Sequence, residues 1–413
     1  MQSDDSRKSL WGRILRRQQP NIVSMDSQPA IPYTLWQLVA YFLGLGTHGF
    51  GGPVALVGYM HRDLVERRGW ITEADYREGM ALAQLAPGPL AAQLAIYLGY
   101  VHYGILGATL VGVAFVLPSF FMVLALGWAY VLYGGLDWMR AVFYGVGANV
   151  IGIIAYSAYK LTRKTIGTDW LLWIVYLASA FATVITESEL VWLVLAGGII
   201  VWFVKTRPQL HGTAAFVLPL GFTMPGIPVA NNQTLWQIAV FFTEAGAFVF
   251  GSGLAIIPFL YGGVVTEYGW LNDDQFLDAV AVAMITPGPV VITVAFIGFL
   301  IAGFSGATVA ALATFLPCYL FTVIPAPYFK KYGKRPGIVA FVDGVTAAAI
   351  GAISGAVIVL GRRMIIENGT PDLFKVGMML ATLAIFIRGW NIPEPLIVLG
   401  AAIVGLIAYP LLH

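Results

Sequence analysis

Long apolar stretches, separated by short polar turns, run along almost the whole chain after its first 31 residues. Most approach the ~20 residues that a helix needs to cross a bilayer. No Lys or Arg occurs between Arg77 and Arg140, or between Arg207 and Lys330, so long tracts can enter lipid without burying a cation. The pattern predicts uninterrupted spans at residues 105–133, 139–161, 170–185, 190–204, 306–325, 338–360, 374–387 and 395–411.

Two further apolar stretches lie before the span at residues 105–133, and both are interrupted by Gly and Pro. The first meets Gly49-Phe50-Gly51-Gly52-Pro53, and the second meets Pro87-Gly88-Pro89. A Pro-Gly-Pro removes two backbone donors and disfavours the helical conformation of the residue before each proline, so a helix must break there. Backbone groups freed inside a membrane have to face protein or a watered cavity. We therefore expect the breaks to line a site, whether each interrupted helix crosses the membrane or re-enters on the same side.

The chain is an internal duplication. Thr34-Leu35-Trp36-Gln37 recurs as Thr234-Leu235-Trp236-Gln237, and the second break recurs as Pro287-Gly288-Pro289, both at a shift of 200 residues. Beyond the second break the shift becomes 199. The sequence thus predicts a tail at residues 1–31, a first transmembrane repeat at 32–204, a linker at 205–232 and a second repeat at 233–413.

Equivalent loops of the two repeats carry opposite charge. The turn that contains Arg67 and Arg68 has a twin with no cation and with Glu267, whereas the basic loop at 328–335 corresponds to a turn without cations at 133–137. Under the positive-inside rule, such loops lie on opposite sides of the membrane. The pattern therefore favours inverted-topology repeats, a plan typical of secondary transporters. The equivalent residues Arg163 and Arg362 are basic in both repeats and count against it.

Composition supports the same class of protein. The chain is 59% hydrophobic and 11% charged with a mean hydropathy of +0.80, which indicates an all-α polytopic membrane protein. A net charge of +2 gives no reason to expect nucleic acid as a partner. The single Cys318 excludes an internal disulfide or a cysteine cluster, and the five histidines show no ligand spacing, so we expect neither metal nor cofactor. The basic tail predicts a cytoplasmic N-terminus, either as a disordered segment or as a short interfacial helix.

Several linked motifs resemble the chromate ion transporter family in its long, duplicated form. They include Phe50-Gly51-Gly52-Pro53, the turn Val65 to Trp70, Ala81 to Pro89, the stretch Ala95 to Tyr100, and their echoes in the second repeat. The resemblance implies export of chromate across the inner membrane of bacteria, driven by the proton gradient and conferring chromate resistance, by two halves of opposite topology. The chain departs from the family pattern at Gly251-Ser252-Gly253, where the second cluster is not all glycine.

Chromate and sulfate are tetrahedral dianions, and a site for them near the bilayer midplane needs hydrogen-bond donors. Half-helices that restart after Pro53, Pro89, Gly253 and Pro289 direct N-terminal amides into one region if the repeats face each other. Alternatively, the small residues serve only close helix packing. The predicted substrate-binding residues are Gly51, Gly52, Pro53, Gln84, Pro87, Gly88, Pro89, Gln93, Gly251, Ser252, Gly253, Thr286, Pro287, Gly288, Pro289 and Thr293.

Ionisable residues near the breaks are candidates for coupling protons to transport. Glu244 lies in the middle of an apolar segment, where a carboxylate is costly unless it is neutralised or faces a cavity, so it has either a proton-coupling role or a satisfied packing role. His48 is a second candidate for proton coupling. Glu78 and Asp278 are twins near helix starts, and we interpret both as stabilisers of the helix dipole.

Four arginines lie nearest to the breaks in the sequence: Arg62, Arg67, Arg68 and Arg77. Arg77 precedes Pro87 by ten residues, which is about 15 Å along a helix at ~1.5 Å per residue, so it belongs at the membrane rim. These arginines either fix the topology or form a basic cytoplasmic mouth that concentrates anions.

The sequence thus predicts a secondary active transporter, a proton-coupled antiporter that exports chromate from the cytoplasm. Sulfate or another oxyanion is the alternative substrate, and a passive anion channel or an integral membrane enzyme is the alternative function. The enzyme alternative has little support, because the sequence shows no acidic cluster for Mg²⁺-diphosphate chemistry, no His-rich metal set and no nucleophile motif with its base. Expected partners are the oxyanion, membrane lipid and, as an open alternative, a second copy of the chain in a homodimer.

Overall fold

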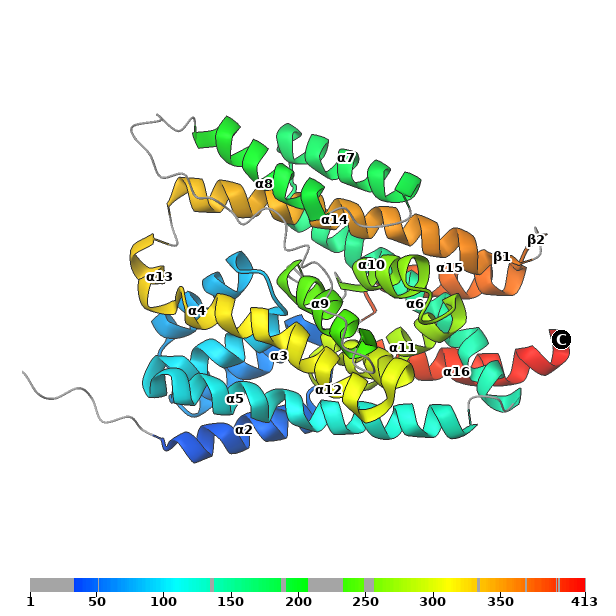
Figure 1. The fold of residues 1–413 in the computed structure, drawn as a ribbon, viewed down its shortest axis with the longest axis horizontal. Helices are drawn as coiled ribbons and strands as arrows, with labels where there is room; N and C mark the ends of the chain where they lie inside the picture. Colours follow the sequence, from blue (N-terminus) through cyan, green and yellow to red (C-terminus); the bar gives the residue numbers. More distant parts are fainter. Residues whose placement is uncertain are drawn as a thin grey trace, which may run out of the picture.

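The structure is a computed structural model that describes residues 33–50, 52–133, 137–186, 191–206, 233–248, 256–332, 335–367, 370–390, 392 and 394–412. The predicted tail at 1–31 and nearly all of the predicted linker lie outside the described residues, as do Gly51 and the cluster Gly251-Ser252-Gly253. The described chain is almost entirely helical, which confirms the predicted all-α class (Figure 1).

The first repeat is helical, apart from short turns between its described elements. In chain order these are α2 (Leu35–His48), α3 (Gly52–Met60), the π-helix η1 (His61–Arg67), α4 (Glu73–Leu85), α5 (Leu90–Tyr133), α6 (Asp137–Thr165), α7 (Trp170–Thr186) and α8 (Val191–Thr206).

The second repeat follows the same order, with small additions. Its elements are α9 (Gln233–Phe248), α10 (Ile256–Tyr261), the π-helix η3 (Gly262–Glu267), α11 (Asp273–Ile285), the 3₁₀-helix η4 (Val290–Ile292), α12 (Thr293–Val323), α13 (Ala326–Tyr332), α14 (Pro336–Ile365), the paired strands β1 (Ile366–Glu367) and β2 (Thr370–Pro371), α15 (Leu373–Ile387) and α16 (Glu394–Leu412). A π-helical segment follows α3 and α10 alike, which the sequence did not lead us to expect.

The first interrupted helix of each repeat folds back as a hairpin around the glycine cluster. In the first repeat, the Tyr41 hydroxyl of α2 donates a hydrogen bond to the carbonyl of Tyr59 in α3 (3.3 Å). These two residues are equally far from Phe50 in the sequence, one before it and one after it, so α2 runs antiparallel to α3. In the second repeat, Phe241 of α9 stacks on Phe259 of α10 in the equivalent way, with ring centroids 5.2 Å apart.

The second interrupted helix is also a hairpin, with the Pro-Gly-Pro at its tip. A Cβ added to Gly79 of α4 would overlap the ring of Tyr97 in α5. These two residues are equally far from Gly88 in the sequence, one before it and one after it. The chain therefore turns back at the break, and α4 and the first part of α5 lie side by side. Re-entry of this hairpin on one side of the membrane stays a prediction.

A glycine turn divides the long helix that follows each Pro-Gly-Pro. Gly104 (φ +57°) and Gly303 (φ +60°) are left-handed, so α5 and α12 each consist of two helices that meet at a sharp bend. The two helices are so close beside the bend that only residues without a Cβ fit between them. A Cβ on Gly99 would lie 2.5 Å from the carbonyl oxygen of Gly107. The two bends coincide with the predicted starts of uninterrupted spans near residues 105 and 306.

The helices of the two repeats run in opposite senses. The end of α5 lies at the right of Figure 1, whereas α12 ends at the left, where α13 follows; likewise α6 begins at the right and α14 at the left. This arrangement is the one that the loop charges favoured.

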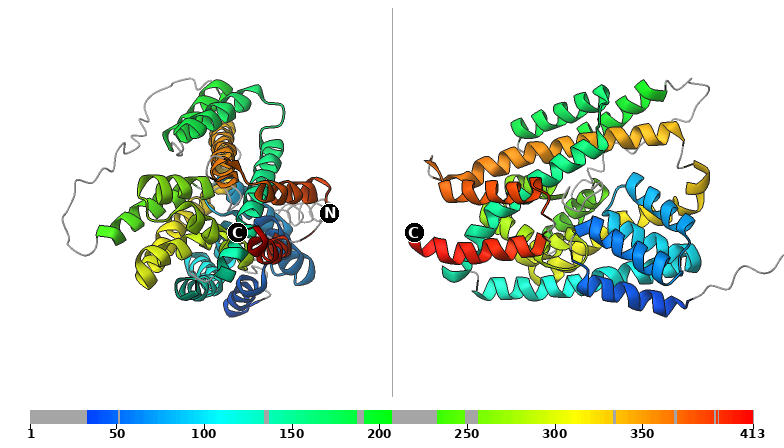
Figure 2. Two further views of the ribbon diagram at one scale, coloured as in Figure 1. Left: turned by 90° about the vertical axis from the view of Figure 1, so that its right-hand side faces the viewer. Right: turned by 180° about the vertical axis from the view of Figure 1, so that it is seen from behind.

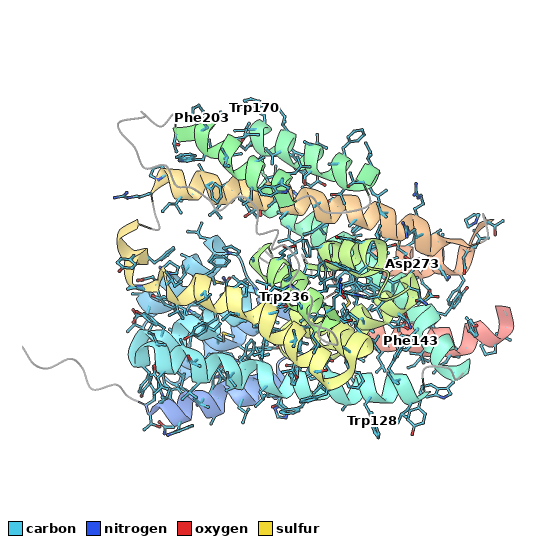
Figure 3. The ribbon with its side chains drawn as sticks, in the orientation of Figure 1. Trp128, Phe143, Trp170, Phe203, Trp236 and Asp273 are labelled. Carbon is cyan, nitrogen blue, oxygen red and sulfur yellow. The ribbon has the colours of Figure 1, made fainter. Side chains whose placement is uncertain are left out.

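The outer surface is that of a chain surrounded by lipid. Large apolar side chains such as Trp128, Trp170 and Trp236 are exposed there (Figure 3). Among the described residues, four helical stretches are long and apolar enough to cross a membrane, of which the first and third include the glycine bends: Leu90–Tyr133, Ala141–Arg163, Val290–Phe329 and Pro336–Arg363. The shorter predicted spans correspond to the apolar helices Trp170–Thr186, Trp192–Thr206, Leu373–Ile387 and Pro395–Leu411.

The repeats also exchange partners. In all views α14 of the second repeat lies along α7 and α8 of the first, while α6 of the first packs against α15 and α16 of the second (Figures 1 and 2). Glycines allow close contact at these crossings. A Cβ on Gly351 would overlap the carbonyl oxygen of Tyr176, and one on Gly145 would overlap that of Ala401. The two repeats are therefore packed together along their outer helices as well as along α5 and α12.

Candidate functional site

The hairpin tips of different repeats meet in the structure. The amide of Gly288, in the Pro-Gly-Pro of the second repeat, donates a hydrogen bond to the carbonyl of Gly49, in the glycine cluster of the first repeat, across 2.9 Å. Gly288 is buried and has a φ of +95°, a conformation that residues with a Cβ rarely adopt. The contact joins two breaks that are far apart in the sequence.

Ser119 forms a second bridge at the same place. This residue of α5 is fully buried, and its hydroxyl oxygen lies 2.7 Å from the carbonyl oxygen of Pro287 and 3.3 Å from that of Gly46. A serine hydroxyl has one hydrogen to donate, so the shorter contact, to Pro287, is the main bond. Ser119 was not among the predicted residues. The available signal was a hydroxyl directly after Pro118 inside an apolar span, at the position that Cys318 occupies in the second repeat.

Gln93 lies behind the tip of the other Pro-Gly-Pro. Its side chain is fully buried, and Nε2 donates a hydrogen bond to the carbonyl of Pro87 (2.7 Å). Among the described residues, its second polar atom, Oε1, has no hydrogen-bond partner. A buried side-chain amide of which only one polar atom has a hydrogen-bond partner is unusual in a folded protein.

The other predicted side chains are divided between the tips and the surface. Thr286 and Thr293 are buried, but their hydroxyls donate to nearby backbone carbonyls, those of Val282 (2.6 Å) and Val290 (2.8 Å). Gln84 is exposed on α4. At the tips, the buried residues are Gly88, Pro89, Pro287, Gly288 and Pro289, and the partly buried ones are Gly52, Pro53 and Pro87.

The two candidates for proton coupling have exposed side chains. Glu244 is exposed on α9, and His48 is exposed at the end of α2, where its Nδ1 lies 3.2 Å from the carbonyl oxygen of Gly44. Asp278, by contrast, is only 7% exposed, and it accepts a hydrogen bond from the Tyr130 hydroxyl of the first repeat (2.7 Å). Stabilising a helix dipole, the role that the sequence suggested for Asp278, does not require this burial.

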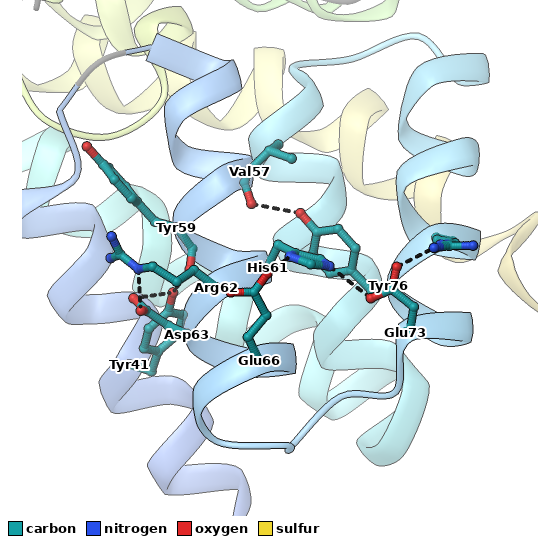
Figure 4. A network of polar contacts seen from close by, with 10 residues as sticks. Tyr41, Val57, Tyr59, His61, Arg62, Asp63, Glu66, Glu73 and Tyr76 are labelled. Atoms are coloured by element: carbon teal, nitrogen blue, oxygen red, sulfur yellow. Dashed lines mark hydrogen bonds and ion pairs between the residues drawn. The ribbon is translucent and has the colours of Figure 1, made fainter.

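The arginines of the predicted basic mouth belong to a cluster of charged side chains in the first repeat (Figure 4). This cluster lies on η1 and at the start of α4, away from the hairpin tips. Asp63 pairs with Arg62 (3.0 Å) and Arg67 (3.5 Å), and the guanidinium of Arg68 stacks on Trp70, 4.5 Å from the ring centroid. All three cations thus have local partners.

The rest of this cluster is centred on Glu73, at the start of α4. Glu73 pairs with His61 (2.8 Å) and Arg77 (2.7 Å), and Glu66 lies 3.1 Å from the other ring nitrogen of His61. The hydrogen bonds from His61 and Arg77 hold the pKa of Glu73 below its usual range. Such a network is typical of the solvated end of a membrane protein.

The tips offer hydrogen-bond donors and small residues. Amide, hydroxyl and carboxamide donors are present there in Gly288, Ser119 and Gln93, and each donates to a carbonyl oxygen. Within the described part of the chain, no group of three His, Cys, Asp or Glu side chains is arranged to hold a metal ion.

Comparison with known proteins points to the same kind of function and confirms the family resemblance. The family model described as "Chromate transporter" matches the chain twice, at residues 36–202 and 236–406. A "Chromate transport protein" of Cupriavidus metallidurans is 67% identical over 403 residues, covering 96% of this chain and 99% of that protein. A "Probable chromate transport protein" of Synechococcus elongatus is 64% identical over 380 residues, covering 91% and 96%.

A more distant relative also matches over almost its whole length. The "Chromate transport protein" of Pseudomonas aeruginosa is 29% identical over 397 residues, which is 92% of this chain and 94% of that protein. No solved structure matches the chain.

Proposed function

The chain belongs to the chromate transporter family, and from that premise we propose that it exports chromate from the cytoplasm across the bacterial inner membrane. Export is coupled to proton entry and confers resistance to chromate. The family match extends over both repeats, so one chain contains both halves of the transport unit.

The meeting of the tips carries this proposal. Gly288 and Gly49 come from repeats that run in opposite senses (Figure 1), and their hydrogen bond joins a hairpin tip of one repeat to a hairpin tip of the other. In secondary transporters with inverted repeats, the substrate binds at broken helices, and movement of one repeat against the other opens the site to alternate sides. If one repeat moves against the other, the contact between their tips must change, and a substrate bound there is exposed to the other side of the membrane.

Chromate binds by exchanging hydrogen bonds. The dianion replaces carbonyl oxygens as the acceptor for the Gly288 amide, the Ser119 hydroxyl and Nε2 of Gln93. The helix starts behind Pro89 and Pro289 add the positive ends of their dipoles. Of the other predicted residues, Gly52, Pro53, Pro87, Gly88, Pro287, Thr286 and Thr293 shape this cradle, and Gln84 is exposed on α4. The predicted residues Gly51, Gly251, Ser252 and Gly253 lie outside the described residues.

The outer cluster of Arg62, Arg67, Arg68 and Arg77 forms the cytoplasmic rim. Because these cations are paired or stacked locally, they contribute a diffuse field that concentrates anions and make no fixed contact with the substrate.

Transport of labelled chromate into inverted vesicles, with and without an imposed proton gradient, tests the proposal. Chromate uptake that rises with the gradient is expected, whereas uptake that follows only the chromate gradient would indicate a channel. Labelled sulfate serves as the second substrate. Sulfate transport at the same rate, with full competition, would make a general oxyanion transporter the better description.

A pair of glutamine variants tests the site. Gln93→Glu should abolish uptake, because it places a negative charge beside the tip and the ionised side chain cannot donate to Pro87. Gln37→Glu makes the same change at the exposed start of α2, where glutamate also suits the capping box, and it should retain uptake. Equal uptake by both variants would remove Gln93 from the proposed site.

A further inference from the structure

Asp278 is a buried carboxyl group that links the two repeats. It lies on α11, in the second hairpin of the second repeat, and accepts a hydrogen bond from the hydroxyl of Tyr130 on α5 of the first repeat (2.7 Å). In the described part of the chain, no Lys, Arg or His side chain forms an ion pair with it. A carboxyl group buried in this way, without a cation, needs a specific explanation.

The surroundings of this pair are apolar. The ring of Tyr130 packs edge-on against Phe143 of α6 and Phe296 of α12, with centroids 5.6 Å and 5.5 Å away. An ionised carboxylate loses its hydration here and gains one hydrogen bond in return, whereas a bound proton removes the charge altogether. The site therefore suits a carboxyl group that gains and loses a proton.

Few other ionisable groups act on Asp278. Tyr130 faces it from α5, and Asp274, one turn earlier on α11, adds a like charge. On its own helix, Asp273 pairs with Arg363 of α14 (3.7 Å). On α12 the ionisable side chains are the buried thiol of Cys318 and Tyr319, whose hydroxyl lies 2.7 Å from that of Thr109. The short helix η4 consists of Val and Ile alone.

Ionisable side chains on the other elements packed against α11 form contacts with other residues, are exposed or, in the case of Tyr100, are partly buried. Among the described residues, none of them forms a hydrogen bond or ion pair with Asp278. They are Glu267 on η3, Tyr144, Tyr156, Tyr159, Lys160 and Arg163 on α6, Tyr409 on α16, and Tyr97, Tyr100, His102, Tyr103 and Tyr133 on α5.

The equivalent acid in the first repeat has a different partner. Glu78 is partly buried and hydrogen-bonds Tyr97, a residue of its own hairpin. The bond between Asp278 and Tyr130, in contrast, crosses from one repeat to the other. A change in the protonation of Asp278 therefore alters a contact between the repeats.

We propose that Asp278 carries the coupling proton and that its hydrogen bond with Tyr130 transmits the protonation state to the repeat interface. This inference rests on the proposed proton-coupled export. The ionised carboxylate accepts the Tyr130 hydrogen, whereas the protonated carboxyl can donate its own hydrogen and release that bond. Repeat movement that breaks the pair is then easier in the protonated state.

The same helix connects this proton site to the tips. Thr286, which caps the end of α11, is eight residues beyond Asp278, or about 12 Å along a helix at ~1.5 Å per residue. Pro287 and Gly288 follow directly, and they form the bonds to Ser119 and Gly49. A shift of α11 on protonation therefore reaches the substrate site without any intermediate element.

Proteoliposomes loaded with chromate provide the test. Asp278→Asn should still exchange chromate down its own gradient but lose the stimulation by an imposed proton gradient. Asp274→Asn removes a carboxylate from an exposed position of the same helix, and it should keep the stimulation. Tyr130→Phe keeps the ring and removes the hydroxyl, and it should shift the pH at which stimulation is half-maximal.

The outcomes separate this assignment from the proposed function. If the wild type shows gradient stimulation and Asp278→Asn keeps it in full, the assignment to Asp278 is wrong while proton-coupled export stands. The same conclusion follows if Glu244→Gln abolishes the stimulation and Asp278→Asn does not. If the wild type shows no stimulation, proton coupling itself fails, and the assignment fails with it.

Infrared difference spectra give a readout that does not depend on transport. Over the pH range of transport, the wild type should show the C=O band of a protonated carboxyl group. That band should disappear in Asp278→Asn and move in Tyr130→Phe, because the hydrogen bond to the carboxyl is lost. The absence of a titrating band that Tyr130→Phe moves would overturn the proposal even if Asp278→Asn does not fold.

Discussion

The amide of Gly288 lies 2.9 Å from the carbonyl oxygen of Gly49 and donates a hydrogen bond to it, so the second break of the second repeat rests on the first break of the first repeat. Ser119 reinforces this contact from α5 by its bond to Pro287. Both bonds therefore hold the two repeats together at the tips. Under the proposed function, substrate binding and repeat movement share these hydrogen bonds.

Ser119→Ala should weaken the tip contact. It removes the donor to Pro287 and leaves a buried carbonyl without that partner, which costs about 1 kcal/mol or more. We expect a lower Tm and a smaller rise of Tm with added chromate, measured on purified protein in detergent. Ser119→Cys, which copies the second repeat, should be the milder change.

Thr322→Ala is the control for that measurement. Thr322 is also fully buried, but its hydroxyl donates to the carbonyl of Cys318 in its own helix (2.8 Å). The two alanine variants should differ in how much chromate raises their Tm. An equal rise would show that Ser119 has no special role at the tips.

Gly46→Ala should disturb the packing behind the first tip. Its Cβ would overlap the carbonyl oxygen of Phe115 and lie 3.3 Å from Cγ of Pro118, both on α5. Overpacking of this kind costs about 1–3 kcal/mol. Gly44→Ala lies on the same helix, and its Cβ would meet no atom within 4 Å, so it should fold and transport like the wild type. Unfolding midpoints and uptake rates compare the two variants, and equal values would contradict the close packing at Gly46.

Cysteine labelling checks the opposite senses of the repeats. In a Cys318→Ala background, Arg68→Cys and Glu267→Cys mark nearly equivalent outer ends of the two repeats. A membrane-impermeant maleimide should label one of them in inverted vesicles and the other in intact cells. Labelling of both from one side would contradict inverted topology.

Glu73 should make stability depend on pH. The hydrogen bonds from His61 and Arg77 lower the pKa of Glu73 in the folded protein. The contribution of Glu73 to folding stability is therefore fully present above the ordinary pKa of 4.5, and it is lost as the pH falls through the lower pKa of the folded state. Glu73→Gln should therefore lower the Tm at neutral pH, and its difference from the wild type should shrink below pH 4.5. Glu66→Gln, which loses a contact to His61 alone, should show a smaller difference. A difference for Glu73→Gln that stays constant with pH would contradict this account.

Much of the fold follows from the sequence, because its signals are local. The duplication, the breaks and the starts of the later spans depend on residue identity along short stretches, such as the glycines at 104 and 303. The course of each interrupted helix does not. A Pro-Gly-Pro permits either a crossing or a return, and the choice depends on contacts such as that between Gly79 and Tyr97.

The candidate site was less accessible to sequence reasoning. In the sequence, Asp278 lies near the start of a helix, where an acid commonly stabilises the helix dipole. What distinguishes it in the structure is the hydrogen bond from Tyr130, a residue 148 positions away in the sequence. Ser119 likewise depends on Pro287, 168 residues away. Glu244 lies among apolar residues in the sequence, yet its side chain is exposed on α9. The sequence could not predict this exposure, because the periodicity of one short segment does not show which face of the helix other helices cover.

The exchange of helices between repeats has a consequence for biosynthesis. On the ribosome, α7 and α8 are completed before α14, the helix that lies along them, has been made. Until the second repeat has been made, the faces of α7 and α8 that contact α14 are uncovered. The two repeats can pack together only after the synthesis of α14. If the chain is cut between the repeats, we expect each half alone to leave these helix faces uncovered, and two halves synthesised together to associate through them.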